Sequence, residues 1–301
     1  MHPRLILANL EQHPLRHRLN IEFHAGPPVP LVGATLVSHL VFQHGESVST
    51  DERENLLGLC KGLTCTAIDN SDSCLTLETA TLRMRWERHT EFSSYTFFRS
   101  LAAAEVLDAD ATALDALHLD WMQGIPGKLM VATQVELRSA AELSPDSVLA
   151  DLTANGRTMV AAKVADKAAW VFSDFKINNG LSRFLVLNEA MTQRQAGRTV
   201  QRLVEIETYR MFALLGLPIA KETGRWLYSS EQQLAELMDQ IGRARSPRDE
   251  RDALTALSSL AAEGEHSVAR TTFRFAASHA YQGMVMQCIE ELRESRISGF
   301  P

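Results

Sequence analysis

The chain has 301 residues, of which 45% are hydrophobic and 22% are charged, and its formal net charge at pH 7 is -7. This is the composition of a globular protein with enough apolar residues for a sizeable core. The negative charge excludes an overall cationic field that would attract phosphate backbones, so we expect no nucleic-acid partner.

The cysteines and the N-terminus exclude other classes. The four cysteines have neither the paired spacing of a zinc site nor the density of a secreted disulfide framework, so we interpret them as reduced thiols. The first 22 residues lack the features of a signal peptide. No run of about 18 apolar residues is present, so we expect the chain as given to be soluble.

The N-terminal part of the chain is predicted to be an extended arm followed by β-rich sequence. Pro27, Pro28 and Pro30 interrupt regular structure, which gives an arm over residues 1–33. The next predicted elements are a strand at 34–42, a capped helix at 51–61, and strands at 63–68, 74–89 and 92–99.

The second half of the sheet contains the clearest turn signal. A helix is predicted at 111–123 and a strand at 128–137, and three more strands are expected between residues 157 and 187. Asn179 and Gly180 between two of these strands are typical of a tight hairpin, so the sheet must be partly antiparallel. Residues 34–188 are therefore predicted to be an α+β domain, with a mixed sheet and flanking helices.

Residues 189–301 are predicted to be entirely helical, with breaks at Pro218, at 242–247 and near Gly264. The last helix, at 268–296, has a wide apolar stripe, which another helix or a second copy of the chain must cover. The stripe consists of Phe273, Ala276, Ala277, Ala280, Tyr281, Met284, Val285, Cys288, Ile289 and Leu292. If a second copy covers the stripe, the chain forms a homo-oligomer through these helices.

Common catalytic motifs are missing, and the most unusual local pattern is a charged ladder. In a strand, Arg83, Arg85, Glu87, His89 and Glu91 would share one face. Glu87 and His89 are candidates for an acid/base or ligand pair, and Arg85 is a candidate ligand-binding residue. The alternative is a solvated face with Arg–Glu ion pairs.

A carboxylate also interrupts an apolar helical stripe. Glu207 lies among Leu203, Val204 and Met211, so we expect it to be buried and to meet an arginine such as Arg85 or Arg183 on the sheet. A structural ion pair between helix and sheet is one interpretation of this pattern. A catalytic acid with a raised pKa is the other.

The N-terminal arm is rich in histidine. His13, His17 and His24 lie near Glu22, but their spacing is not diagnostic of a metal site. We predict no metal and no cofactor, and we interpret these histidines as surface or interface residues.

Three blocks of the sequence resemble a bacterial family named domain of unknown function 3422, described as membrane-anchored. They are His13-Pro14-Leu15-Arg16 with Glu22-Phe23-His24-Ala25, then residues 86–93 (Trp-Glu-Arg-His-Thr-Glu-Phe-Ser) with Tyr95 and Thr96, and then residues 205–211. The chain departs from the family pattern at Gly26, where the family usually has arginine. Arg16 and His24 of the first block are further candidates for ligand binding.

The resemblance implies a membrane anchor after residue 301 and a location at the cytoplasmic face of the inner membrane. It implies no activity, so an enzyme is not favoured. The leading hypothesis is a cytosolic domain for self-association or partner binding. The alternatives are a ligand-sensing or transport-linked domain with an architecture like that of CorA channels, and a hydrolase-like enzyme that uses Glu87, His89 and Glu207.

Overall fold

A computed structural model describes residues 13, 28–44, 49–62, 66–70, 73–102, 105, 107–108, 110–154 and 159–295. The chain folds into two compact units. The first comprises residues 1–204 and 291–301, and the second comprises residues 205–290. The described residues contain no helix with the length and apolar character needed to cross a membrane.

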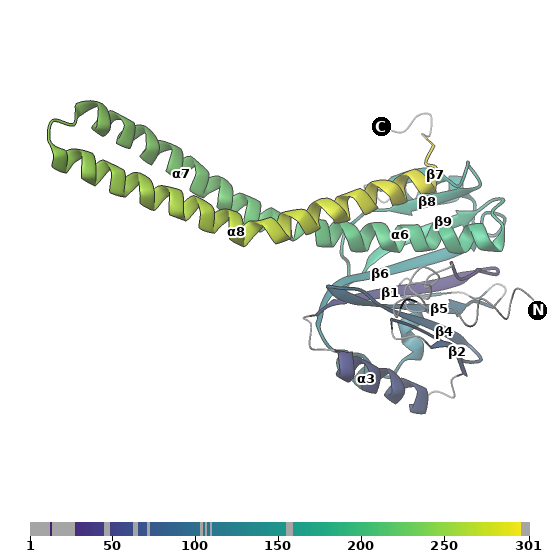
Figure 1. Ribbon diagram of the computed structural model, residues 1–301. Helices are drawn as coiled ribbons and strands as arrows, with labels where there is room; N and C mark the ends of the chain where they lie inside the picture. The colour runs from purple at the N-terminus through teal and green to yellow at the C-terminus, as the bar shows by residue number, and fades with distance from the viewer. Residues whose placement is uncertain are drawn as a thin grey trace, which may run out of the picture. The chain divides into compact units, whose positions relative to one another are not determined.

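The first unit is built around a nine-stranded mixed sheet (Figure 1), which confirms the predicted α+β fold. The strands lie in the order β2-β3-β4-β5-β1-β6-β9-β8-β7. Neighbouring strands are antiparallel except for β6 and β9, which are parallel. The strands are β1 (Thr35–Gln43), β2 (Thr66–Asn70), β3 (Cys74–Glu78), β4 (Leu82–Arg88), β5 (Phe92–Ser100), β6 (Lys128–Ser139), β7 (Val160–Val164), β8 (Ala169–Ser173) and β9 (Ser182–Asn188).

Two of the predicted elements in this unit are divided. The expected strand at 74–89 is split into β3 and β4, because the side chain of Thr79 accepts a hydrogen bond from the backbone N–H of Leu82 and closes a turn. The expected helix at 111–123 is split into η1 (Ala113–Ala116) and α4 (Leu119–Gln123). The helix α5 (Pro145–Ala154) follows β6.

The predicted hairpin turn is confirmed. Asn178 and Leu181 form a bridge around Asn179 and Gly180, which have φ angles of 51° and 81°. Both angles lie in the left-handed region that a two-residue hairpin of this type requires. This turn leads from β8 into β9, which are antiparallel neighbours in the sheet.

One face of the sheet carries a hydrophobic core of the first unit. Alternate residues of β1, β4 and β5 pack there with α3 (Ser49–Gly62), η1 and α4. The fully buried side chains of this core include Leu36, Leu56, Met84, Tyr95 and Phe97. The period-two alternation therefore places residues such as Arg85 and His39 on the opposite face.

The helical part of the chain consists of α6 (Gln193–Leu214), α7 (Gly216–Arg243) and α8 (Pro247–Leu292). The first break lies at Leu215, and Pro218 is accommodated in the first turn of α7, where its missing N–H does no harm. The break within 242–247 is confirmed. The break expected near Gly264 is wrong, because α8 continues through this residue, which lies against the ring of Trp226.

Candidate functional site

The charged ladder of β4 is an ion-paired surface with one buried member. Arg85 donates to Glu87 across 2.9 Å, and their side chains are 8% and 25% exposed. Arg83 pairs with Glu78 at 2.5 Å. The Arg–Glu ion pairs that we expected for a solvated strand face are therefore present. Arg85, however, is desolvated, so its charge acts more strongly on its surroundings than that of a solvated arginine.

Arg85 belongs to a row of polar residues that crosses six strands. The strand register aligns these side chains in one line, and His39 Nδ1 lies 2.8 Å from Thr96 Oγ1 within it. The row consists of Thr76, Arg85, Thr96, His39, Thr133 and Ser182. A buried polar row of this kind needs internal partners, which the histidine and hydroxyl side chains supply to one another.

The histidines near this row are held neutral. Burial, and then the charge of His89, lower the pKa of His39 to about 3. Desolvation by the atoms around its ring, and then the charge of His44, lower the pKa of His89 to about 4. His89 directly follows β4, and part of the residue is exposed to solvent. A general base is most effective when its pKa is near the operating pH, so neither imidazole is tuned for proton abstraction near pH 7.

Glu207 is buried, as predicted, but its partner is not the expected one. The residue is 2% exposed, and Arg210 of the same helix donates to both carboxylate oxygens, at 3.2 and 2.9 Å. The expectation of a sheet arginine is wrong, because a residue three positions along a helix is within reach of a carboxylate. Arg85 pairs with Glu87, and Arg183 pairs with Asp110.

The other predicted site residues are divided between the two units or lie outside the described residues. Glu87 and His89 belong to the first unit and Glu207 belongs to the second. Arg16, His17 and His24 lie outside the described residues. Among the residues that are described, no group of three or more histidine, cysteine, aspartate or glutamate side chains is placed to hold a metal ion.

The structure reveals a buried carboxylate that sequence reasoning missed. Glu52 of α3 has no exposed surface, its oxygens accept no hydrogen bond, and Arg88 Nε lies 3.9 Å away. Burial, and then the charge of Glu52, raise the pKa of the nearby Tyr95 phenol. An acidic residue in the first turn of a capped helix is typically exposed, so the sequence offered no signal for this burial.

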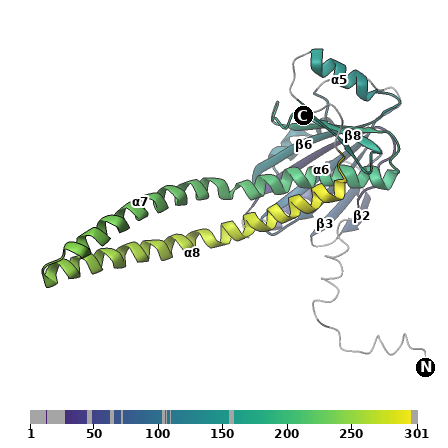
Figure 2. The same ribbon diagram turned by 90° about the horizontal axis from the view of Figure 1, so that it is seen from above.

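In the second unit, α7 and α8 form a long antiparallel hairpin (Figures 1 and 2). Glu222 pairs with Arg270 at 2.7 Å, and Gly216 and Trp226 of α7 lie against Ser278 and Gly264 of α8. These contacts define which positions face the neighbouring helix. On α7 they include residues 216, 223 and 226, and on α8 they include residues 264, 271 and 278.

One broad side of this hairpin is apolar and exposed. On α7, positions 217, 220, 224, 227, 231, 234, 238 and 241 alternate in steps of three and four, the heptad spacing of a helix-packing seam. Positions 217, 224 and 227 each follow one of the contact positions of α7 by one residue, and positions 254, 261, 268 and 275 of α8 each follow a buried or half-buried position (253, 260, 267 and 274) by one residue. In antiparallel helices this rotation leads to the same side of the pair.

We call this side the hairpin face and define it by eight large side chains. They are 37% to 64% exposed, and together they present an apolar area on the order of 700 Å², more than the largest patch of a typical monomer. The eight are Leu217, Leu227, Leu234, Met238, Ile241, Leu254, Val268 and Phe275. Glu231 is the charged residue of the α7 stripe, and Glu265 of α8 lies between stripe positions 261 and 268 on the same side.

The stripe predicted on the last helix is only half covered. Tyr281 stacks on Tyr209 and contacts Phe212, and Cys288 and Leu292 are buried. Phe273 and Met284 from the other half of the stripe remain 69% and 39% exposed. Large apolar side chains in this half of the stripe are therefore exposed in the described structure.

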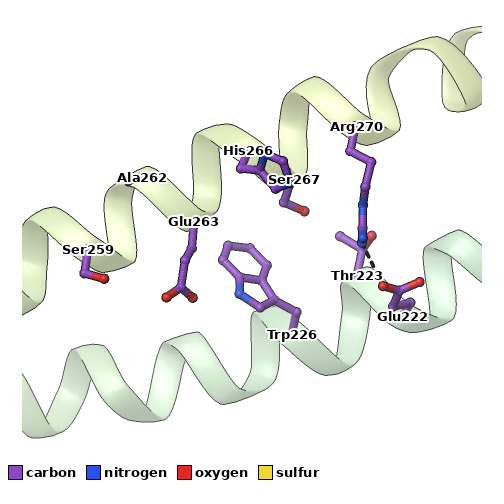
Figure 3. A pocket seen from close by; sticks show the side chains of 9 residues that line it. All are labelled: Glu222, Thr223, Trp226, Ser259, Ala262, Glu263, His266, Ser267 and Arg270. Atoms are coloured by element: carbon purple, nitrogen blue, oxygen red, sulfur yellow. Dashed lines mark hydrogen bonds and ion pairs between the residues drawn. The ribbon is translucent and has the colours of Figure 1, made fainter.

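The opposite side of the hairpin is polar and hollowed. Figure 3 shows Trp226 of α7 between Glu222, Glu263, His266 and Arg270 around a pocket of about 420 Å³. Small residues of α8 form much of its remaining wall. The two sides of the hairpin therefore differ in chemistry, one being apolar and the other polar.

The fold and these surfaces define an α+β protein with a projecting pair of long helices. A family model described as "Protein of unknown function (DUF3422)" matches residues 11–301, so the chain belongs to this family. No curated protein and no solved structure matches the chain.

Proposed function

We propose that the chain is a self-associating domain in which two copies pair through their hairpin faces. The observation that supports this most is the exposed heptad seam of α7, which has Leu217, Leu227, Leu234, Met238 and Ile241 at its apolar positions. A seam of this kind is normally covered by another helix. Pairing two hairpins face to face would produce a four-helix arrangement with the apolar side chains inside.

The size of the surface favours a second copy of the chain as the occupant. A standard protein interface takes about 800 Å² from each partner, which is close to the apolar area of the hairpin face. Closed twofold homodimers are the most common assemblies of soluble proteins. A twofold axis displaced from the level of Glu231 and Glu265 would keep these carboxylates away from their symmetry mates.

A lipid surface suits the hairpin less well. Amphipathic helices that bind anionic membranes carry lysine and arginine on the polar side. The polar side of α7 mixes both signs, with Glu222, Arg225, Glu236, Asp239 and Arg243. The charge pattern therefore favours a protein partner, and the anchor after residue 301 stays a prediction of the family resemblance alone.

Charge placed on the hairpin face should separate the copies. We expect the double variant Leu234→Glu and Met238→Glu to weaken dimerisation at least about 100-fold, since buried unpaired carboxylates cost several kcal/mol. The matched control, Ser229→Glu with Gln232→Glu, puts the same charge on the polar side of α7 and should leave the affinity unchanged. Sedimentation velocity over a concentration series measures both, and equal effects of the two variants would refute this surface as the interface.

A further inference from the structure

The polar side of the hairpin has a pocket between α7 and α8, where side chains of two packed helices normally fill the space. Its volume of about 420 Å³ lies in the range of small-molecule pockets. The hollow exists because α8 presents Ser259, Ala262 and Ser267 at this level instead of leucine-sized side chains. The floor is the large indole of Trp226, which is approached by Gly264 from α8.

Two polar groups in this pocket lack partners within the described structure. The hydroxyl of Thr223 is buried and makes no hydrogen bond, although it lines the pocket. No hydrogen bond or ion pair is found for Glu263, whose carboxylate lies beside Trp226 in Figure 3. A buried hydroxyl without a partner costs about 1–3 kcal/mol, which an occupant with a hydrogen-bonding group would recover.

The charges of the lining select the sign of the occupant. Arg270 is neutralised by Glu222 at 2.7 Å, which leaves Glu263 as the carboxylate available to a ligand. The face of a tryptophan ring attracts cations through its quadrupole, more strongly than phenylalanine or tyrosine does. An aromatic wall with one unpaired carboxylate is thus complementary to an organic cation.

We propose that this pocket binds an organic cation of the alkylguanidinium or alkylammonium class. The alkyl part lies in the hollow left by the small residues, and the charged group lies between the Trp226 ring and the Glu263 carboxylate. The cation can come from a free small molecule or from an arginine or lysine side chain of another protein. The pocket and the hairpin face are on opposite sides of the hairpin, so the two proposals can fail separately.

Binding of butylguanidinium, measured by calorimetry on the whole chain, tests the proposal. We expect butylguanidinium to bind at least about tenfold more tightly than its neutral isostere butylurea. Glu263→Gln in α8 should lower the affinity for butylguanidinium about tenfold, whereas Glu236→Gln in α7, on the same side of the hairpin, should not. Glu263 is exposed, so its replacement should leave the fold intact, and Trp226→Leu provides a second variant with the same expected direction.

A peptide arm distinguishes the sources of the cation. An acetylated Gly-Arg-Gly amide that binds more tightly than butylguanidinium, and loses this advantage when citrulline replaces arginine, would assign the pocket to a protein side chain. A peptide that binds more weakly would assign it to a free cation. Equal binding of butylguanidinium and butylurea, or equal affinity in Glu263→Gln and the native chain, would overturn the proposal.

Discussion

The carboxylate of Glu52 is completely buried, and the Nε atom of Arg88 lies 3.9 Å from it without a hydrogen bond between them. This is an incomplete ion pair, because one charge is desolvated while its partner is 23% exposed. Such a pair stabilises the fold only if the attraction between the two charges is larger than the cost of removing them from water. Here no hydrogen bond from a described residue compensates the desolvation of the carboxylate oxygens.

We therefore predict that Glu52→Gln raises the free energy of unfolding at neutral pH by about 1–2 kcal/mol. The amide keeps the shape of the side chain and removes the buried charge. Glu54→Gln in the same helix is the control, because Glu54 is exposed and its replacement should change stability by less than about 0.5 kcal/mol. Urea denaturation of the two variants decides, and a clear destabilisation by Glu52→Gln would mean that the carboxylate is well paired.

Replacing Glu207 by alanine should destabilise the chain, because Arg210 would lose its bidentate partner. Arg210 is 40% exposed, so water can solvate part of the released charge. We expect a loss of about 1–3 kcal/mol, below the value for a fully buried pair. Arg210→Met should restore part of the loss in the double variant, and a null effect of Glu207→Ala would contradict the pairing.

The histidine at the centre of the sheet should make the fold sensitive to acid. His39 is neutral in the folded chain down to its pKa of about 3, whereas the unfolded chain binds a proton below about pH 6.5. Stability should therefore fall as the pH is lowered from about 6.5 toward 3, on the order of 1 kcal/mol per pH unit. His39→Asn should flatten this dependence and His279→Asn should not, as followed by thermal unfolding at several pH values.

The turn between β7 and β8 contains three consecutive non-glycine residues with positive φ, at Ala165, Asp166 and Lys167. Left-handed backbone costs an alanine about 1–2 kcal/mol, which a glycine does not incur. We predict that Ala165→Gly stabilises the chain by up to about 1 kcal/mol, after the added flexibility of the unfolded state is considered. The neighbouring change Ala168→Gly should destabilise it instead, and thermal shifts of the same sign for both would contradict the strain.

Local sequence signals identified the elements of this fold better than their pairing. The Asn179–Gly180 turn depends on the conformations of two adjacent residues, so the sequence alone predicts it. The parallel pairing of β6 with β9 depends on a connection through α5, β7 and β8, which no local pattern encodes. The helix through Gly264 was missed because helical neighbours on both sides outweigh the cost of one glycine.

The candidate sites show the same limit. Period-two alternation correctly grouped Arg85 with Glu87 on one face of β4, since it depends only on backbone geometry. The burial of Glu52 and the choice of Arg210 as the partner of Glu207 depend on distances that composition does not determine. The apolar stripe of α8 indicated that a covering surface was required, and the extent of the hairpin face became visible only with α7 beside it.

The mass of the native chain in solution tests the proposed self-association most directly. Sedimentation equilibrium at micromolar concentrations should give twice the 33.4 kDa mass of one chain, with dissociation on dilution. The dimer should be insensitive to moderate salt, because its interface is apolar. Concentrations up to about 100 µM would reveal a dimer unless its dissociation constant is well above this value. A mass of 33.4 kDa at every concentration in this range would contradict a second copy as the partner of the hairpin face.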